Sequence, residues 1–270
     1  MSKANLGSCI GASPLFWLVV LTGAVVFVYD SGTTSRAAAP AATKWSDLIS
    51  AADLQSEAQD AAERLAADTA TAASYKQNGE SIAHTAYLLA IWANIAVEHD
   101  GPLPFKGNAA TIRDKALAIA KTKTHSAAKS TADEVKSLVQ GGASAGGSPS
   151  AAMKWSELCE LDQVMEEVNP RSTALRRAVR PASFKKMAKQ AARDAAVLAA
   201  LAQVAQHHTE KAEGEKKVDE WNKLSTDLRT AAIELSKAAA ASNASGAKAA
   251  QSKVLKACNE CHEVFRIDTE

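Results

Sequence analysis

The chain has 270 residues, with 31 basic and 30 acidic side chains, so its formal net charge of +1 creates no strong field for a polyanion. Only 5% of the residues are aromatic, and no basic stripe is joined to stacking rings, which argues against nucleic-acid binding. Alanine costs least in a helix and fills strand faces poorly, so the alanine-rich composition predicts an all-α protein. The length suffices for one large or two small domains.

Residues 1–40 are interpreted as a signal peptide or membrane anchor with a linker of small residues. Lys3 precedes an apolar run that ends at Asp30. Signal-peptide cores have about 15 residues and membrane spans need about 20, so the length of the segment at 10–29 leaves both interpretations open. The charges at its two ends place the rest of the chain in the periplasm or on the outer face of the membrane, free after cleavage or anchored by 10–29.

The remainder of the chain contains two similar parts. The motif Lys-Trp-Ser-Asp-Leu at 44–48 recurs as Lys-Trp-Ser-Glu-Leu at 154–158, an offset of 110 positions. Further matches have offsets of 109, 116 and 119, and the offset grows only across loops, as a tandem duplication predicts. Chance similarity between alanine-rich helices is the alternative. The Gly/Ser-rich segment 141–152 is a flexible linker by composition, so the predicted domains are 44–140 and 153–267.

Each part is predicted to contain four helices. In the second part, Trp155, Leu158, Met165 and Val168 recur at helical spacing, which predicts one buried face of one helix. Short loops make neighbouring helices antiparallel, so we expect two tandem antiparallel four-helix bundles after the N-terminal helix. The predicted helices lie within 45–68, 80–98, 108–121 and 126–139, and at about 155–179, 184–211, 216–241 and 245–265.

The chemistry-bearing motif is the Cys-x-x-Cys-His pattern of Cys258, Cys261 and His262. Two thiols at this spacing can add to the two vinyl groups of one haem, and the adjacent imidazole is a good axial ligand for its iron. An export signal is independent support, because haem of this kind is attached outside the cytoplasm. The motif therefore predicts a covalently bound haem c.

Two other metal or redox sites were considered for the same motif. A structural zinc site needs two further ligands, and His207 and His208 are adjacent on a helix, so their side chains point in different directions. A thioredoxin-like pair needs a strand that leads into a helix N-terminus, whereas this pair lies near the end of a helical segment. Both alternatives are less favoured than haem.

The run from Cys258 to Arg266 resembles the C-terminal signature of the cytochrome c′ family, including the related cytochromes c-556. In that family the motif is followed by an aromatic residue and an arginine and lies in the last helix of a four-helix bundle. The resemblance covers 153–267 and implies thioether links at Cys258 and Cys261, iron ligation by His262, and packing of Phe265 and Arg266 beside the haem. The equivalent positions of the first part, 139–143, contain none of these ligands, so its bundle is expected to lack haem.

The resemblance also raises the question of the sixth ligand, which comes from the first helix of the bundle. A methionine there gives a six-coordinate electron-transfer haem, whereas an apolar residue leaves iron open to nitric oxide or carbon monoxide. Met165 is the candidate, although methionine is also a common core filler, and Leu158 and Leu161 lie nearer the family's usual separation. The less favoured candidates, which are more typical of buried hydrophobes or helix caps, are Cys159, His84, His99, His125, His207 and His208.

The sequence therefore predicts an exported cytochrome that transfers single electrons to redox partner proteins, with a gas-binding five-coordinate haemoprotein as the alternative. A haem enzyme is not predicted, because the first helix lacks the distal histidine and arginine that a peroxidase needs. A purely structural protein would leave the intact motif unexplained. An uncleaved N-terminal segment would add membrane association, and a homodimer is open because related bundles often dimerise through their first two helices.

Overall fold

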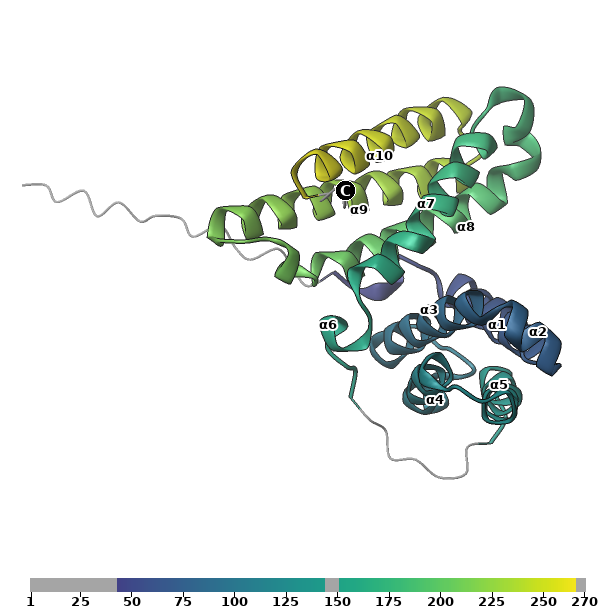
Figure 1. Cartoon of the computed structure of the whole chain (residues 1–270). Coiled ribbons are helices and arrows are strands. Elements are labelled where there is room, and N and C mark those ends of the chain that lie inside the picture. The colour runs from purple at the N-terminus through teal and green to yellow at the C-terminus, as the bar shows by residue number, and fades with distance from the viewer. Residues whose placement is uncertain (1–42, 144–150, 266–270) are drawn as a thin grey trace, which may run out of the picture. The chain divides into compact units, whose positions relative to one another are not determined.

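The computed structural model describes residues 43–143 and 151–265, all of which belong to one unit, 42–270. Every regular element in these two ranges is a helix, so the all-α prediction is confirmed for them (Figure 1). Among these residues, no helix combines the length and the hydropathy needed to cross a bilayer. The expected signal peptide or anchor at 1–40 lies outside the described residues.

Residues 45–139 form a set of helices that we call the N-terminal helix group. It contains α1 (Ala51–Asp68), α2 (Ala72–Gln77), α3 (Gly79–Glu98), α4 (Ala109–Lys121) and α5 (His125–Val139), with short 3-10 helices at Trp45–Asp47 and Lys106–Asn108. Ser50 starts α1, because its hydroxyl accepts a hydrogen bond from the backbone N–H of Asp53 at 3.0 Å. Helices α1 and α4 each pack against both α3 and α5.

Residues 155–265 form the C-terminal helix group. It contains α6 (Trp155–Leu158), α7 (Leu161–Ala178), α8 (Pro181–Gln206), α9 (Glu215–Ala240) and α10 (Ala244–Phe265), with a short 3-10 helix at Thr209–Lys211. Pro181 occupies the first turn of α8, where its missing N–H costs no intrahelical hydrogen bond. Helix α8 packs against α7 and α9, and α9 packs against α10, whereas α10 makes few contacts with α7 (Figure 1).

The first helix predicted for the second part, at 155–179, is wrong in one respect, because the chain breaks it into α6 and α7. Cys159 is extended, with φ −154° and ψ 161°, and α7 starts afresh at Leu161. The backbone N–H of Glu160 donates to the Gln163 side chain at 2.7 Å, a capping contact that begins the new helix. Consequently Trp155 and Leu158 do not share a helix face with Met165.

Helices α3 and α8 supply the centre of the hydrophobic core. Every residue from Leu88 to Ala96 in α3, and from Ala195 to Ala202 in α8, is buried. A helix that is buried on all sides must be covered by neighbours on all sides, as each of these is by the other helices of its group. Most of the buried positions of α8 are alanines, whose small side chains let adjacent helices approach closely.

The two helix groups contact each other through α1 with α8 and through α3 with α7. The rings of Trp45 and Trp155, which occupy equivalent places in the sequence repeat, lie 5.6 Å apart between centroids. The Asn94 side chain binds the backbone of Met153 twice, donating to its carbonyl at 3.0 Å and accepting from its N–H at 2.8 Å. The chain that leads into the C-terminal group is thereby fixed to α3.

Candidate functional site

The Cys-x-x-Cys-His motif lies in the last two turns of α10. Successive residues of an α-helix are about 100° apart, so Cys258, Cys261 and His262 occupy an arc of about 100° on one side of the helix. Both cysteine side chains are partly buried, and Cys258 packs against the core, whereas His262 is exposed. The three side chains therefore share one helix side, with the thiols turned inward and the imidazole toward solvent.

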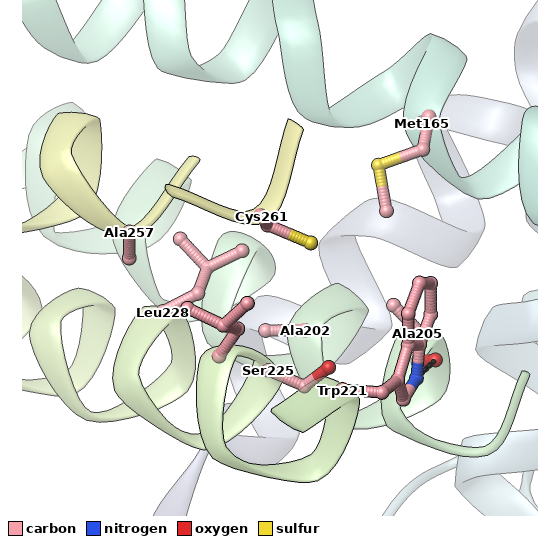
Figure 2. Close-up of a pocket in the computed structure, with 9 residues that line it drawn as sticks. Met165, Ala202, Ala205, Trp221, Ser225, Leu228, Ala257 and Cys261 are labelled. Carbon is pink, nitrogen blue, oxygen red and sulfur yellow. Dashed lines mark hydrogen bonds between the residues drawn. The ribbon is translucent and has the colours of Figure 1, made fainter. Parts of the chain in front are cut away.

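A cavity with about 300 Å³ of empty space, part of it open to solvent, lies between α7, α8, α9 and α10 (Figure 2). Met165 borders it from α7 and Cys261 from α10, and Figure 2 shows the two sulfur-bearing side chains directed into the same space. Only about 30 Å³ of this space is open to the centre of a water-sized sphere, room for about two water molecules, so a haem would have to displace side chains that line it. The other lining residues are Ala202, Ala205, Trp221, Leu224, Ser225, Leu228 and Ala257.

One wall of the cavity, formed by α9, was not anticipated from the sequence. Trp221, Leu224, Ser225 and Leu228 follow one another at steps of three, one and three residues, which places them on one helix face. The indole N–H of Trp221 donates to the carbonyl of Ala205 in α8 at 3.1 Å, so the ring is fixed across the two helices. The helical spacing of these residues is the sequence signal that could have identified this wall.

The aromatic residue that follows the motif also contacts Trp221. The Phe265 and Trp221 rings are 5.0 Å apart between centroids at an interplanar angle of 81°, an edge-to-face arrangement. The ammonium group of Lys217 lies 5.5 Å from the centroid of the Phe265 ring, within cation–π range. Phe265 thus joins the end of α10 to α9 beside the cavity, whereas Arg266 lies outside the described residues.

Burial raises the pKa values of the cysteine thiols in the C-terminal helix group. It raises the pKa of the Cys258 thiol, and burial together with the neighbouring Cys258 raises the pKa of the Cys261 thiol. Burial, followed by the carboxylates of Glu160 and Glu210, raises the pKa of the Cys159 thiol to about 12. The three cysteines within 43–143 and 151–265 are free thiols, and the two of the motif stay protonated and uncharged at neutral pH.

The other residues considered as iron ligands do not line this cavity. They are Leu158, Leu161, Cys159, His84, His99, His125, His207 and His208. Two of the histidines have structural partners instead: His99 Nε2 lies 3.0 Å from the carbonyl oxygen of Ile49, and His125 Nε2 lies 2.9 Å from that of Thr69. Within 43–143 and 151–265, no three His, Cys, Asp or Glu side chains gather to hold a metal ion.

Two sulfur donors, from Cys261 and Met165, line this apolar space, while Cys258 and the exposed imidazole of His262 lie on the same side of α10 outside its lining. Sulfur and imidazole donors suit transition metals such as iron, and do not suit the hard cations magnesium or calcium. Among the described residues that line the cavity, Cys261 carries the one ionisable group. The lining therefore suits an apolar group bound through sulfur, and a group as large as haem would enter only if the helices around this small space moved apart.

Comparison with known proteins gives no match by any of three routes. No family model matches the chain, no curated protein matches it, and no solved structure matches its fold.

Proposed function

We propose that the chain is an exported cytochrome of the cytochrome c′ type that carries one covalent haem c in its C-terminal helix group and transfers single electrons. The observation that carries the proposal is that Cys261, from the attachment motif, and Met165, from a different helix, border the same apolar cavity. When bound, a c-type haem supplies an iron that is reversibly oxidised and reduced by one electron. Cys258 and Cys261 would tether it, and His262 would ligate the iron.

The walls of the cavity suit this role. Trp221, fixed by its hydrogen bond to Ala205, and Leu228 keep one side of the space apolar and poor in water. Met165 faces that space from α7 and is the thioether that could serve as the sixth ligand. Thioether ligation favours the reduced state of iron and so raises its potential.

The proposal includes two tandem antiparallel four-helix bundles that arose by duplication, of which the first lacks haem. The long first helices, α1 and α7, each follow a short helix that begins at an equivalent tryptophan. A similar internal contact also recurs: Arg113 donates to Asn94 at 3.2 Å, and Arg229, at the equivalent place, donates to Gln203. The agreement between sequence offset and contacts supports a common origin for the two helix groups.

Export to the periplasm or the outer face of the membrane belongs to the same proposal. It depends on the charged and apolar pattern of residues 1–40. The proposed transfer of electrons to redox partner proteins requires this export, as does membrane association through residues 10–29.

A gas-binding haemoprotein is the second candidate function. It is favoured by the aliphatic lining from Leu224 and Leu228, because uncharged diatomic gases need no charged partner in their site. The two candidates differ in whether Met165 occupies the sixth position. Reduced protein with and without carbon monoxide distinguishes them, since a six-coordinate haem changes its absorption spectrum little on exposure to the gas.

Covalent attachment is tested by producing the full chain in a host that matures c-type cytochromes. We expect haem to remain with the denatured protein through acid extraction and to appear in its intact mass. The paired replacement of Cys258 and Cys261 by alanine should abolish this, whereas Cys159→Ala, which removes a buried thiol outside the motif, should retain it. Haem that extracts freely from the wild-type chain, or its absence by mass, contradicts the proposal.

A further inference from the structure

The turn of α7 that carries Met165 is weakly held by its own helix. It begins just after the break at Cys159, and Pro170 lies inside the helix on its other side. Proline has no N–H to donate to the carbonyl of Glu166, four residues earlier, and its ring crowds that carbonyl. On the cavity side, α10 makes few contacts with α7. Helix α8 supplies most of the packing of α7, and the position of this turn depends in addition on what holds the face of α7 turned away from the cavity.

The opposite face is held by the N-terminal helix group. His84, on α3, places Nδ1 2.8 Å from a carboxylate oxygen of Glu166 and Nε2 3.6 Å from one of Glu167. These two glutamates directly follow Met165 in the sequence. The imidazole therefore lies within ion-pair distance of the same turn from which the methionine points into the cavity.

A second contact holds α7 beyond Pro170. The Arg171 guanidinium donates to Glu167 at 2.5 Å, which spans the proline, and to Glu57 of α1 at 2.6 Å. Burial raises the pKa of Glu167, but the nearby imidazole of His84 and the charge of Arg171 outweigh it, and the pKa lies below its ordinary value. The N-terminal group thus holds α7 on both sides of its weak point.

These contacts follow an approximate two-fold relation between the helix groups. Glu57 and Glu167 are 110 positions apart, and His84 and Arg193 are 109 apart, so all four occupy equivalent places in the repeat. Glu57 of α1 pairs with Arg193 of α8 at 2.7 Å, and Glu167 of α7 pairs with His84 of α3. A reciprocal pattern of this kind is that of an isologous interface between two subunits. The N-terminal group occupies the place of a partner subunit within one chain.

We propose that the N-terminal helix group is a built-in partner that sets the position of Met165 relative to the cavity, with His84 as the positioning residue. This gives the haem-less part of the chain a function that its own residues do not reveal. The inference rests on the proposed function for its effect on iron, because Met165 would be held near or away from the sixth position. The placement of Met165 itself can be tested whether or not haem is bound.

The test measures the rate at which dilute chloramine-T oxidises Met165 to its sulfoxide in the full chain. Peptide mass spectrometry follows the reaction, and the rate in the wild-type chain is compared with that in each variant. We expect His84→Ala to accelerate oxidation about fivefold, the change in local opening that loss of one partly buried pair produces. Met187, a partly buried methionine of α8, is the internal reference and should react at the wild-type rate. His84→Arg should retain the slow rate, because an arginine pairs with the equivalent glutamate, Glu57, in the reciprocal contact.

Two further variants separate positioning from loss of fold. His125→Ala removes a histidine that contacts Thr69 within the N-terminal group, and it should leave the Met165 rate unchanged. Glu166→Gln alters an exposed carboxylate, so it should keep the fold and accelerate Met165 oxidation by a smaller factor than His84→Ala. An unchanged Met165 rate in His84→Ala, or equal acceleration at Met187, overturns the inference.

In haem-loaded chain, we expect His84→Ala also to shift the midpoint potential, whereas His125→Ala should not. An unchanged potential in His84→Ala counts against control of the iron by the N-terminal group. If intact mass shows no haem at all, the proposed function fails, and the oxidation rates still decide whether His84 positions Met165.

Discussion

Replacement of Arg171 by methionine perturbs the buried charge network between the helix groups. The guanidinium donates to Glu57, Glu167 and Asp194 at 2.6, 2.5 and 2.8 Å. None of these three carboxylate side chains is more than 10% exposed. Burial lowers the pKa of Arg171, but Glu57 and Glu167 outweigh it, and the pKa lies above its ordinary value. Arg171 is therefore the shared cation of three buried anions.

The expected loss in free energy of unfolding depends on which charged side chains keep an ion-pair partner in the variant. Loss of one member of a buried ion pair costs about 3–5 kcal/mol, and we expect about 3 for Arg171→Met because Glu57 retains Arg193 at 2.7 Å. Glu57→Gln should cost less, about 1–2 kcal/mol, the scale of one hydrogen bond to a charged group. In that variant Arg171 keeps two carboxylates, and Arg193 keeps Asp60 at 2.5 Å.

The assay is urea denaturation of the full chain at neutral pH, followed by far-ultraviolet circular dichroism. The control is Lys129→Met, which removes an exposed i,i+4 pair with Asp133 and should cost less than about 0.5 kcal/mol. If Arg171→Met costs less than Glu57→Gln, the carboxylates do not depend on the shared cation, and the reasoning is refuted.

Three further predictions concern single side chains. In haem-loaded protein, Met165→Ala should lower the midpoint potential and increase carbon monoxide binding, with a stability cost of about 2 kcal/mol; an unchanged spectrum with the gas would show that Met165 only packs. Ser46 donates its hydroxyl and N–H to Asp100 and lowers the pKa of that carboxyl from 3.8 to about 2, so the stabilisation is complete above pH 3.8 and is lost as the pH falls toward 2. Ser46→Ala should return this pKa toward 3.8 in an NMR titration, and no movement would contradict the assignment. Cys159, with its pKa at about 12, should resist iodoacetamide at pH 8 until urea unfolds the chain, and rapid labelling of native protein would contradict its burial.

The helical class and most helix positions could be predicted from the sequence, because both depend on local properties. Alanine-rich segments with apolar residues every three or four positions favour helices whatever they pack against. Predicted helices at 80–98 and 126–139 correspond closely to α3 and α5. The motif of Cys258, Cys261 and His262 was likewise visible, because its meaning depends on spacing along the chain.

Only the tertiary structure shows the helix break at Cys159 and the walls of the cavity. The same is true of the contacts between His84 of α3 and the glutamates of α7. A helix face shows which residues are buried, but the partner that buries them lies elsewhere in the chain, so Trp221 could not be assigned to the same space as Met165. From the sequence, His84 is interpreted as a helix-cap histidine, whereas the packing of α3 on α7 places it beside Glu166. Contacts between residues about 80 positions apart depend on how whole helices pack, and the local sequence around either residue contains no record of that packing.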